Sequence, residues 1–137
     1  MQINSHLSVL IHDLAKKYGG RTALEYKDYG GTQWKHVSWN EFSNQVSRVS
    51  DALLALGVDV QEKIAVFSQN SIHYLYTDFG AWGVRACTIP LYATTSEETM
   101  QYVINEARIR YIFCGEQEQY DKARHVQNLC SSLQKII

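Results

Sequence analysis

Four short apolar runs separated by helix-length segments dominate the second half of the sequence and constrain its fold most strongly. Continuous apolar runs of this length are typical of parallel strands, because helices cover both faces of such a sheet. Right-handed crossovers join these strands into one lobe of a doubly wound sheet. The runs are Ile64–Phe67, Ala86–Ile89, Tyr111–Cys114 and a last one that begins at Lys135–Ile137. The sequence therefore predicts an α/β fold with a βαβαβαβ parallel-sheet lobe over about residues 61–137.

The segments between these runs have the patterns of helices. Ser71–Trp82 is apolar on nearly every side, which suits a buried helix. Ser96–Ala107 and Glu116–Leu133 each carry apolar residues along one helical face. Thr95, with Glu98 three residues later, forms a capping box that predicts where the Ser96–Ala107 helix begins.

A helix and a hairpin are predicted at the N-terminal end. Leu7–Tyr18 has apolar residues at helical spacing, and Gly19 and Gly20 end that helix. Thr22–Lys27 and Gln33–Val37 alternate as half-buried strands, which predicts a hairpin. The turn residues between the two strands are Asp28, Gly30 and Gly31.

A second amphipathic helix is predicted to begin at Ser38. Ser38 and Glu41 form a capping box, and Gly57 ends the apolar stripe. The stripe is too short for a coiled coil, so we expect a helix packed on a core. Its members are Trp39, Phe42, Val46, Val49, Leu53 and Leu56. Residues 1–137 are thus expected to form one unit, with the helix and hairpin in about residues 1–60 and the sheet lobe after them.

Charge and cysteine content narrow the function class. Thirteen Lys and Arg against 14 Asp and Glu leave a net charge of −1, which argues against nucleic acid or an anionic membrane as a partner. Cys87, Cys114 and Cys130 fit neither a disulfide framework nor a metal knuckle, so we predict buried thiols in a reducing cytosol.

No segment predicts export or membrane insertion. Met1–Ser5 lacks the basic residues of a signal peptide, and the longest uncharged run, Ile64–Thr77, contains too many polar residues to span a bilayer. We therefore predict a cytoplasmic protein without a transmembrane segment.

The polar residues that could carry chemistry have simpler structural explanations. Ser68, Ser71 and His73 follow the first predicted strand, where active sites of parallel sheets lie. Ser71 or Asn70, however, suits the cap of the next helix, and a single His there is more often a polar surface group.

The remaining candidates are interpreted in the same way. Glu97 and Glu98 suit the dipole of a helix start better than acid–base catalysis. The glycine pairs lack the context of a phosphate loop, and the tyrosines and tryptophans are expected in the core. The basic residues Arg108, Arg110, Lys122 and Arg124 are expected on a solvated face with local partners such as Glu106, Glu118 and Asp121. No catalytic, cofactor-binding or metal-binding residue is assigned.

Five collinear strings resemble the opening of the AMP-forming acyl-CoA synthetases, a superfamily of adenylate-forming enzymes with a two-domain fold. They are Val37–Phe42, Leu53–Val58, Lys63–Ser71, Ala81–Tyr92 and Tyr102–Ala107, and the likeness covers roughly Leu7 to Ile137. Pro90–Ser96 and Gly115–Tyr120 look most like bacterial long-chain fatty-acid:CoA ligases, although many relatives have Pro where this chain has Ala93.

The resemblance implies a ligase that uses ATP, Mg²⁺ and CoA to activate a fatty acid. The fatty-acid carboxylate attacks the α-phosphorus of ATP and releases pyrophosphate, and the CoA thiol then displaces AMP. The family's motifs for this chemistry are a Ser/Thr/Gly-rich loop ending Pro-Lys-Gly, a later acidic motif and a Lys in a mobile C-terminal domain. None of them occurs in this sequence, so the resemblance assigns no catalytic residue here and this segment is expected to bind no cofactor tightly.

The last apolar run stops at Ile137 in the middle of an expected strand. We therefore expect the N-terminal segment of a longer ligase, with the remainder of its own polypeptide as its partner. Alone it should be inactive and should self-associate through an open sheet face or edge. The alternative is a stand-alone, non-catalytic binding or interaction module derived from this lobe.

Overall fold

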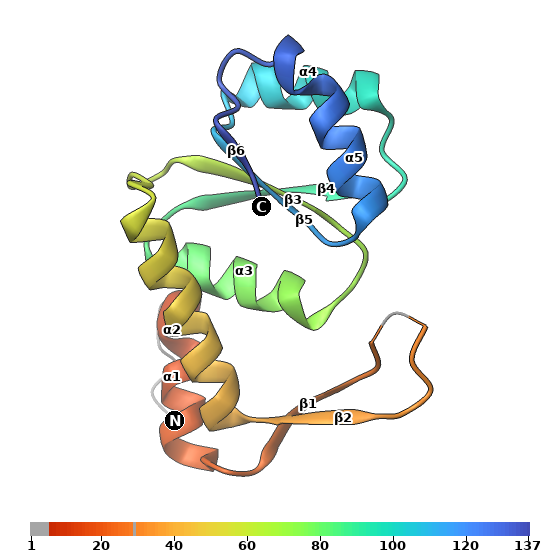
Figure 1. The fold of residues 1–137 in the computed structure, drawn as a ribbon. Helices are drawn as coiled ribbons and strands as arrows, with labels where there is room; N and C mark the ends of the chain where they lie inside the picture. The colour runs from red at the N-terminus through yellow and green to blue at the C-terminus, as the bar shows by residue number, and fades with distance from the viewer. Residues whose placement is uncertain (1–5, 29) are drawn as a thin grey trace.

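A four-stranded parallel sheet forms the centre of the molecule (Figure 1). The computed structural model describes residues 6–28 and 30–137. The signal-peptide prediction rests partly on Met1–Ser5, which lies outside the described residues. The strands are β3 (Lys63–Ser68), β4 (Cys87–Tyr92), β5 (Tyr111–Cys114) and β6 (Lys135–Ile136). Their order is β4-β3-β5-β6, and every neighbouring pair is parallel. The predicted parallel-sheet lobe is confirmed.

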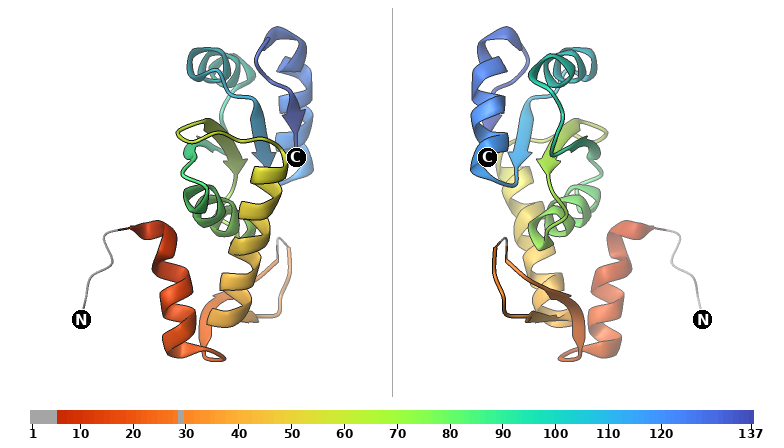
Figure 2. Two further views of the ribbon diagram at one scale, coloured as in Figure 1. Left: turned by 90° about the vertical axis from the view of Figure 1, so that its left-hand side faces the viewer. Right: turned by 90° about the vertical axis from the view of Figure 1, so that its right-hand side faces the viewer.

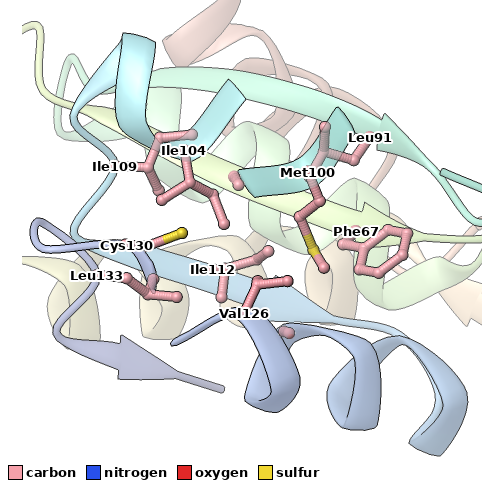
Figure 3. Close-up of a cluster of buried hydrophobic side chains, with 11 residues drawn as sticks. Phe67, Leu91, Met100, Ile104, Ile109, Ile112, Val126, Cys130 and Leu133 are labelled. Carbon is pink, nitrogen blue, oxygen red and sulfur yellow. The ribbon is translucent and has the colours of Figure 1, made fainter. Parts of the chain in front are cut away.

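Helices lie on both faces of this sheet. On one face lie α4 (Glu97–Ala107) and α5 (Gln117–Val126), and on the other lies α3 (Ile72–Gly83) (Figures 1 and 2). Beneath α4 and α5, the side chains of Met100, Ile104 and Val126 meet the strand residues Phe67 and Ile112 in the largest apolar cluster (Figure 3). Complete burial of side chains of this size stabilises the fold by about 1.5–3 kcal/mol each.

The N-terminal elements form a second, smaller assembly beside α3. They are α1 (Leu7–Tyr18), the antiparallel pair β1 (Thr22–Tyr26) and β2 (Lys35–Ser38), and α2 (Trp39–Ala55). The predicted capping box starts α2: the Ser38 Oγ accepts from the Glu41 N–H at 3.2 Å, and the Ser38 N–H donates to the Glu41 carboxylate at 2.8 Å. The latter hydrogen bond lowers the pKa of the Glu41 carboxyl.

Helices α2 and α3 approach each other closely at two glycines of α3. A Cβ on Gly80 would lie 2.5 Å from the Val49 Cγ1 and 3.2 Å from the Val46 carbonyl oxygen, and one on Gly83 would lie 2.6 Å from the Ser50 Oγ. The Ser50 hydroxyl donates to the Gly80 carbonyl at 2.8 Å. Only a residue without a side chain fits this contact, which attaches the N-terminal assembly to the sheet lobe.

One arginine joins the amino ends of the strands. The Arg110 guanidinium donates from Nη1 to both carboxylate oxygens of Glu62 at 3.1 Å and from Nη2 to the Tyr111 hydroxyl at 3.0 Å. The Tyr111 hydroxyl donates in turn to the Leu56 carbonyl at 2.7 Å. Arg110 therefore pairs with a carboxylate 48 residues away, and the prediction of a local partner for it was wrong.

The outer edge of β4 is blocked by a proline. The Cys87 N–H donates to the Glu62 carbonyl of the chain segment before β3 at 2.8 Å. In a parallel strand, the backbone N–H groups of alternate residues point towards opposite neighbours. The backbone position of residue 90 therefore points away from β3. Pro90 has no N–H to offer there, so this edge is a poor template for another strand.

Two predicted helix boundaries were wrong. The cap of α4 is Ser96 rather than Thr95, because the Thr99 N–H donates to the Ser96 Oγ at 3.2 Å. The helix expected over Glu116–Leu133 is α5 followed by the 3₁₀ turn η1 (Gln127–Leu129). It ends early because Cys130 is extended and its side chain enters the core with that of Leu133.

The helix contact at Gly80 yields a stability prediction. Gly80→Ala should lower the free energy of unfolding by about 1–3 kcal/mol, since the clash with Val49 exceeds the gain in helix propensity. The matched control is Gly20→Ala, because an added Cβ there meets nothing within 4 Å. Urea unfolding of both variants measures the difference, and equal midpoints would refute the close contact.

Candidate functional site

The strand order creates a crevice at the carboxyl ends of β3 and β5. The chain leaving β3 at Ser68 runs to α3 on one face, whereas the chain leaving β5 at Gly115 runs to α5 on the other (Figure 1). Neighbouring strands whose connections diverge in this way form a topological switch point, where open α/β sheets bind their ligands. We name this place the β3–β5 crevice.

The β3–β5 crevice has a volume of about 660 Å³ and is closed on one side by the hairpin. Leu24–Asp28 of the hairpin face the loop before α3 and the start of α5 across it. Charge in the lining is mixed, since Lys27 is accompanied by the carboxylates of Glu25, Asp28 and Glu116. The full lining is Leu24–Asp28, Gln69–His73, Leu75, Gly115 and Glu116.

Gly115 lets β3 and β5 lie side by side at the floor of the crevice. A Cβ at this position would lie 2.1 Å from the Ser68 Oγ and 3.1 Å from the Ser68 Cα. The Gly115 N–H donates to the Phe67 carbonyl at 2.9 Å, which continues the ladder to this point. The sequence pattern does not reveal Gly115, Gln69 and Glu116 as crevice residues, because their proximity depends on which faces of the sheet the following helices cover.

The three residues considered for nucleophilic catalysis do not form a catalytic arrangement. The Ser68 hydroxyl donates to the Gln69 carbonyl at 2.7 Å, and the Ser71 Oγ caps α3 by accepting from the Tyr74 N–H at 3.1 Å. The exposed His73 ring packs edge-on against Tyr76 with centroids 5.9 Å apart. The capping role predicted for Ser71 is confirmed.

The charged candidates are dispersed. Glu97 pairs with His125 at 2.9 Å, and Lys122 pairs with Glu118 at 2.8 Å as predicted from their spacing. Arg108 ends α4 in the left-handed conformation, with φ of 53°. Arg124 bonds to Gln127 on the surface. These basic side chains therefore form no phosphate site.

The prediction of three buried thiols was wrong for one cysteine. Cys130 is buried and Cys114 partly so, but Cys87 is exposed at the start of the edge strand β4. Burial raises the pKa of the Cys114 thiol to about 12 and raises that of Cys130 as well. Cys87 is exposed because β4 has a neighbour on one side only, which the sequence pattern does not reveal.

Several aromatic residues lie outside the core, contrary to prediction. The exposed fractions are 87% for Tyr92, 66% for Tyr102 and 61% for Trp34. Tyr92 borders a second groove of about 510 Å³ beside the β3–β5 crevice, and Gln69 and Asn70 line both. The loops that line the crevice and this groove lie next to each other at the carboxyl ends of β3, β4 and β5.

The described residues do not fit a magnesium site. Over residues 6–28 and 30–137, no three His, Cys, Asp or Glu side chains come together. Mg²⁺ prefers several oxygen ligands in octahedral geometry.

Comparison with known proteins shows the family to which this chain belongs. The family described as AMP-binding enzyme matches residues 11–137. The chain belongs to the AMP-binding enzyme family. This membership confirms the resemblance to the adenylate-forming superfamily that the five strings indicated.

The ligases that this AMP-binding chain matches are much longer than the chain itself. The long-chain-fatty-acid–CoA ligase ACSBG2 of Xenopus laevis is 27% identical over 128 residues, which are 93% of this chain and 17% of that ligase. An uncharacterized protein of Mycobacterium tuberculosis is 30% identical over 102 residues, which are 74% of this chain and 57% of that protein. The AMP-binding chain therefore spans about a sixth of the ligase's length.

Solved structures share the fold. The anthranilate CoA ligase AuaEII in complex with anthranoyl-AMP superposes with a TM-score of 0.87 at 18% identity, over 99% of this AMP-binding chain and 25% of that chain.

None of the helices within residues 6–28 and 30–137 has the length and apolar character that a membrane span requires.

The cysteine environments predict selective thiol labelling. At pH 8, Ellman's reagent should modify Cys87 rapidly in the native chain. A pKa of about 12 leaves about one Cys114 thiol in 10⁴ as thiolate at that pH. Raising the pH towards the pKa increases the Cys114 thiolate, and guanidinium should expose all three thiols. Cys87→Ser should abolish the fast phase, and a fast phase that persists would contradict the assignment.

Proposed function

We propose that this chain is the N-terminal part of the large AMP-binding domain of a long-chain fatty-acid:CoA ligase. Its helix and hairpin would be formed by about residues 1–60, and its sheet lobe by about residues 61–137. One observation carries the proposal: 93% of the chain matches 17% of a long-chain-fatty-acid–CoA ligase. The chain then acts as scaffold for chemistry performed elsewhere in the polypeptide.

The proposed reaction is fatty-acid activation in the cytoplasm. The carboxylate attacks the α-phosphorus of ATP, pyrophosphate leaves, and the CoA thiol displaces AMP to give the thioester. Such chemistry depends on positioning and on neutralising the charge that develops at phosphorus, with Mg²⁺ contributing in the complete enzyme. The contribution of this chain is the rigid wall at the carboxyl ends of β3, β4 and β5.

A stand-alone module is the second candidate. The uncharacterized protein of Mycobacterium tuberculosis favours it, since this chain covers 57% of that protein and only 17% of the ligase. A module of this kind would keep the crevice without the ligase motifs and would bind rather than transform a ligand.

The intact mass of the native protein, together with its reading frame past Ile137, separates the two functions. The ligase proposal expects a longer polypeptide that contains a Ser/Thr/Gly-rich loop ending Pro-Lys-Gly and forms acyl-CoA from fatty acid, ATP and CoA. A native chain that ends at Ile137 would overturn it in favour of the module.

The 137-residue chain by itself is expected to form no acyl-adenylate. ATP-dependent formation of fatty acyl hydroxamate in the presence of hydroxylamine measures this. Activity of the chain alone above a no-protein control would show that its own residues perform the chemistry.

We also propose that the isolated chain self-associates through its open sheet face or through the β6 edge, because Pro90 obstructs the β4 edge. Light scattering should show species larger than a monomer at tens of micromolar, roughly the range in which weak association is populated. A monomer throughout that range would contradict the expectation.

A further inference from the structure

Helix α4 packs on the sheet with one of its faces. Met100 and Ile104 are fully buried beneath it, and Val103 packs against the same apolar cluster. Residues half a turn away on a helix project in the opposite direction. Together with α5, helix α4 lies at the end of the molecule away from α1 and the hairpin (Figures 1 and 2). The other face of α4 therefore points outwards, to the surface.

Five residues of α4 line a shallow hollow of about 430 Å³ on this outward side. They are Glu98, Gln101, Tyr102, Asn105 and Glu106, and we name them the α4 outer face. Tyr102 is 66% exposed, and one glutamate lies four residues before it and another four residues after it. Because an α-helix rises 1.5 Å per residue, the two glutamates lie about 12 Å apart along its axis. The α4 outer face thus presents an aromatic ring between two carboxylates.

The fold does not use these two carboxylates. Within the described part of the chain, neither Glu98 nor Glu106 forms an ion pair. On the neighbouring α5, the side chains of Lys122 and His125 pair with other carboxylates. Both charged residues of the α4 outer face are therefore acidic and exposed.

The position of Glu106 is unfavourable for helix α4 itself. The last turn of an α-helix carries a partial negative charge, so a basic side chain stabilises it and an acidic one does not. Helix α4 has no basic residue in its last turn, where Glu106 lies. Glu98, by contrast, lies in the first turn, where a carboxylate is favourable. Helix stability therefore explains Glu98 but not Glu106.

We propose that the α4 outer face binds a helical segment of another protein that carries two basic side chains with an apolar one between them. Arginine suits this role best, because its guanidinium pairs with a carboxylate and also packs on the face of a tyrosine ring. Tyrosine and arginine are common anchors of protein interfaces. Basic residues eight positions apart would match the spacing of Glu98 and Glu106. The inference goes beyond the proposed function and does not rest on it, because the α4 outer face shares no residue with the β3–β5 crevice.

Two other occupants fit this surface less well. A two-fold contact of two copies through α4 would place Glu98 and Glu106 of one copy against the same carboxylates of the other. A single metal ion would need its ligand atoms within about 2.6 Å, which carboxylates two turns apart do not offer. A basic segment of a different protein meets neither obstacle.

The test uses the 137-residue chain and a synthetic Ala-rich helix of about 18 residues, with Arg at i and i+8 and Leu at i+4. Fluorescence anisotropy of the labelled Arg peptide should show saturable binding. A peptide with Glu in place of both Arg should bind about tenfold more weakly or not at all. Tyr102→Ala should weaken binding of the Arg peptide about tenfold, because it removes the central ring.

Two single charge reversals locate the binding. Glu106→Lys should abolish binding of the Arg peptide and should leave the chain folded, since a lysine suits the end of a helix. Asp51→Lys makes the same change in net charge at an exposed residue of α2, outside the α4 outer face, so binding should persist. Equal binding of both peptides, equal loss in both variants, or unchanged binding by Tyr102→Ala would overturn the proposal.

Light scattering of the same variants tests the second copy as occupant. If Tyr102→Ala dissolves a dimer of the chain while the Arg peptide does not bind, the occupant is a second copy and the proposal fails. Saturable binding of the Arg peptide that Glu106→Lys abolishes and Asp51→Lys leaves intact supports it. Neither result depends on whether the native polypeptide is a longer ligase, so failure of this proposal and failure of the proposed function are separate findings.

Discussion

The contact between α2 and α3 at Gly80 holds the two parts of this molecule together. The backbone of α3 lies against Val49 so closely that no side chain fits between them, and the Ser50 hydroxyl satisfies the Gly80 carbonyl at the same place. Helix α2 follows directly from the hairpin strand β2, so its position also sets where the hairpin lies. The hairpin wall of the β3–β5 crevice depends on this contact.

The two ends of the parallel sheet differ in a way that suits a scaffold. At the amino ends, Arg110, Glu62 and Tyr111 join β3, β5 and the end of α2 through hydrogen bonds of good geometry. At the carboxyl ends, the connections diverge and leave the crevice and the neighbouring groove. Rigidity at one end and open loops at the other are the usual arrangement of a ligand-binding α/β sheet.

Several polar groups of this AMP-binding chain serve its own fold. These hydroxyls and carboxylates are engaged in caps and surface pairs, such as Ser71 on α3 and Glu97 with His125. The molecule also presents surfaces: a crevice with mixed charge, and an outer face of α4 with an exposed tyrosine between two carboxylates.

The sequence by itself determined the local elements. The Ser38–Glu41 capping box, the apolar runs of the strands and the hairpin all depend on residues a few positions apart, where helical or strand periodicity and short-range hydrogen bonds decide the conformation. Even there, Ser96 rather than Thr95 caps α4, because the Ser96 hydroxyl accepts from the Thr99 N–H. Only the tertiary structure decided the order of the strands, and with it the exposure of Cys87, the pairing of Arg110 with Glu62 and the approach of Gly115 to Ser68. These features join residues far apart in the sequence, and they depend on which face of the sheet each crossover helix covers.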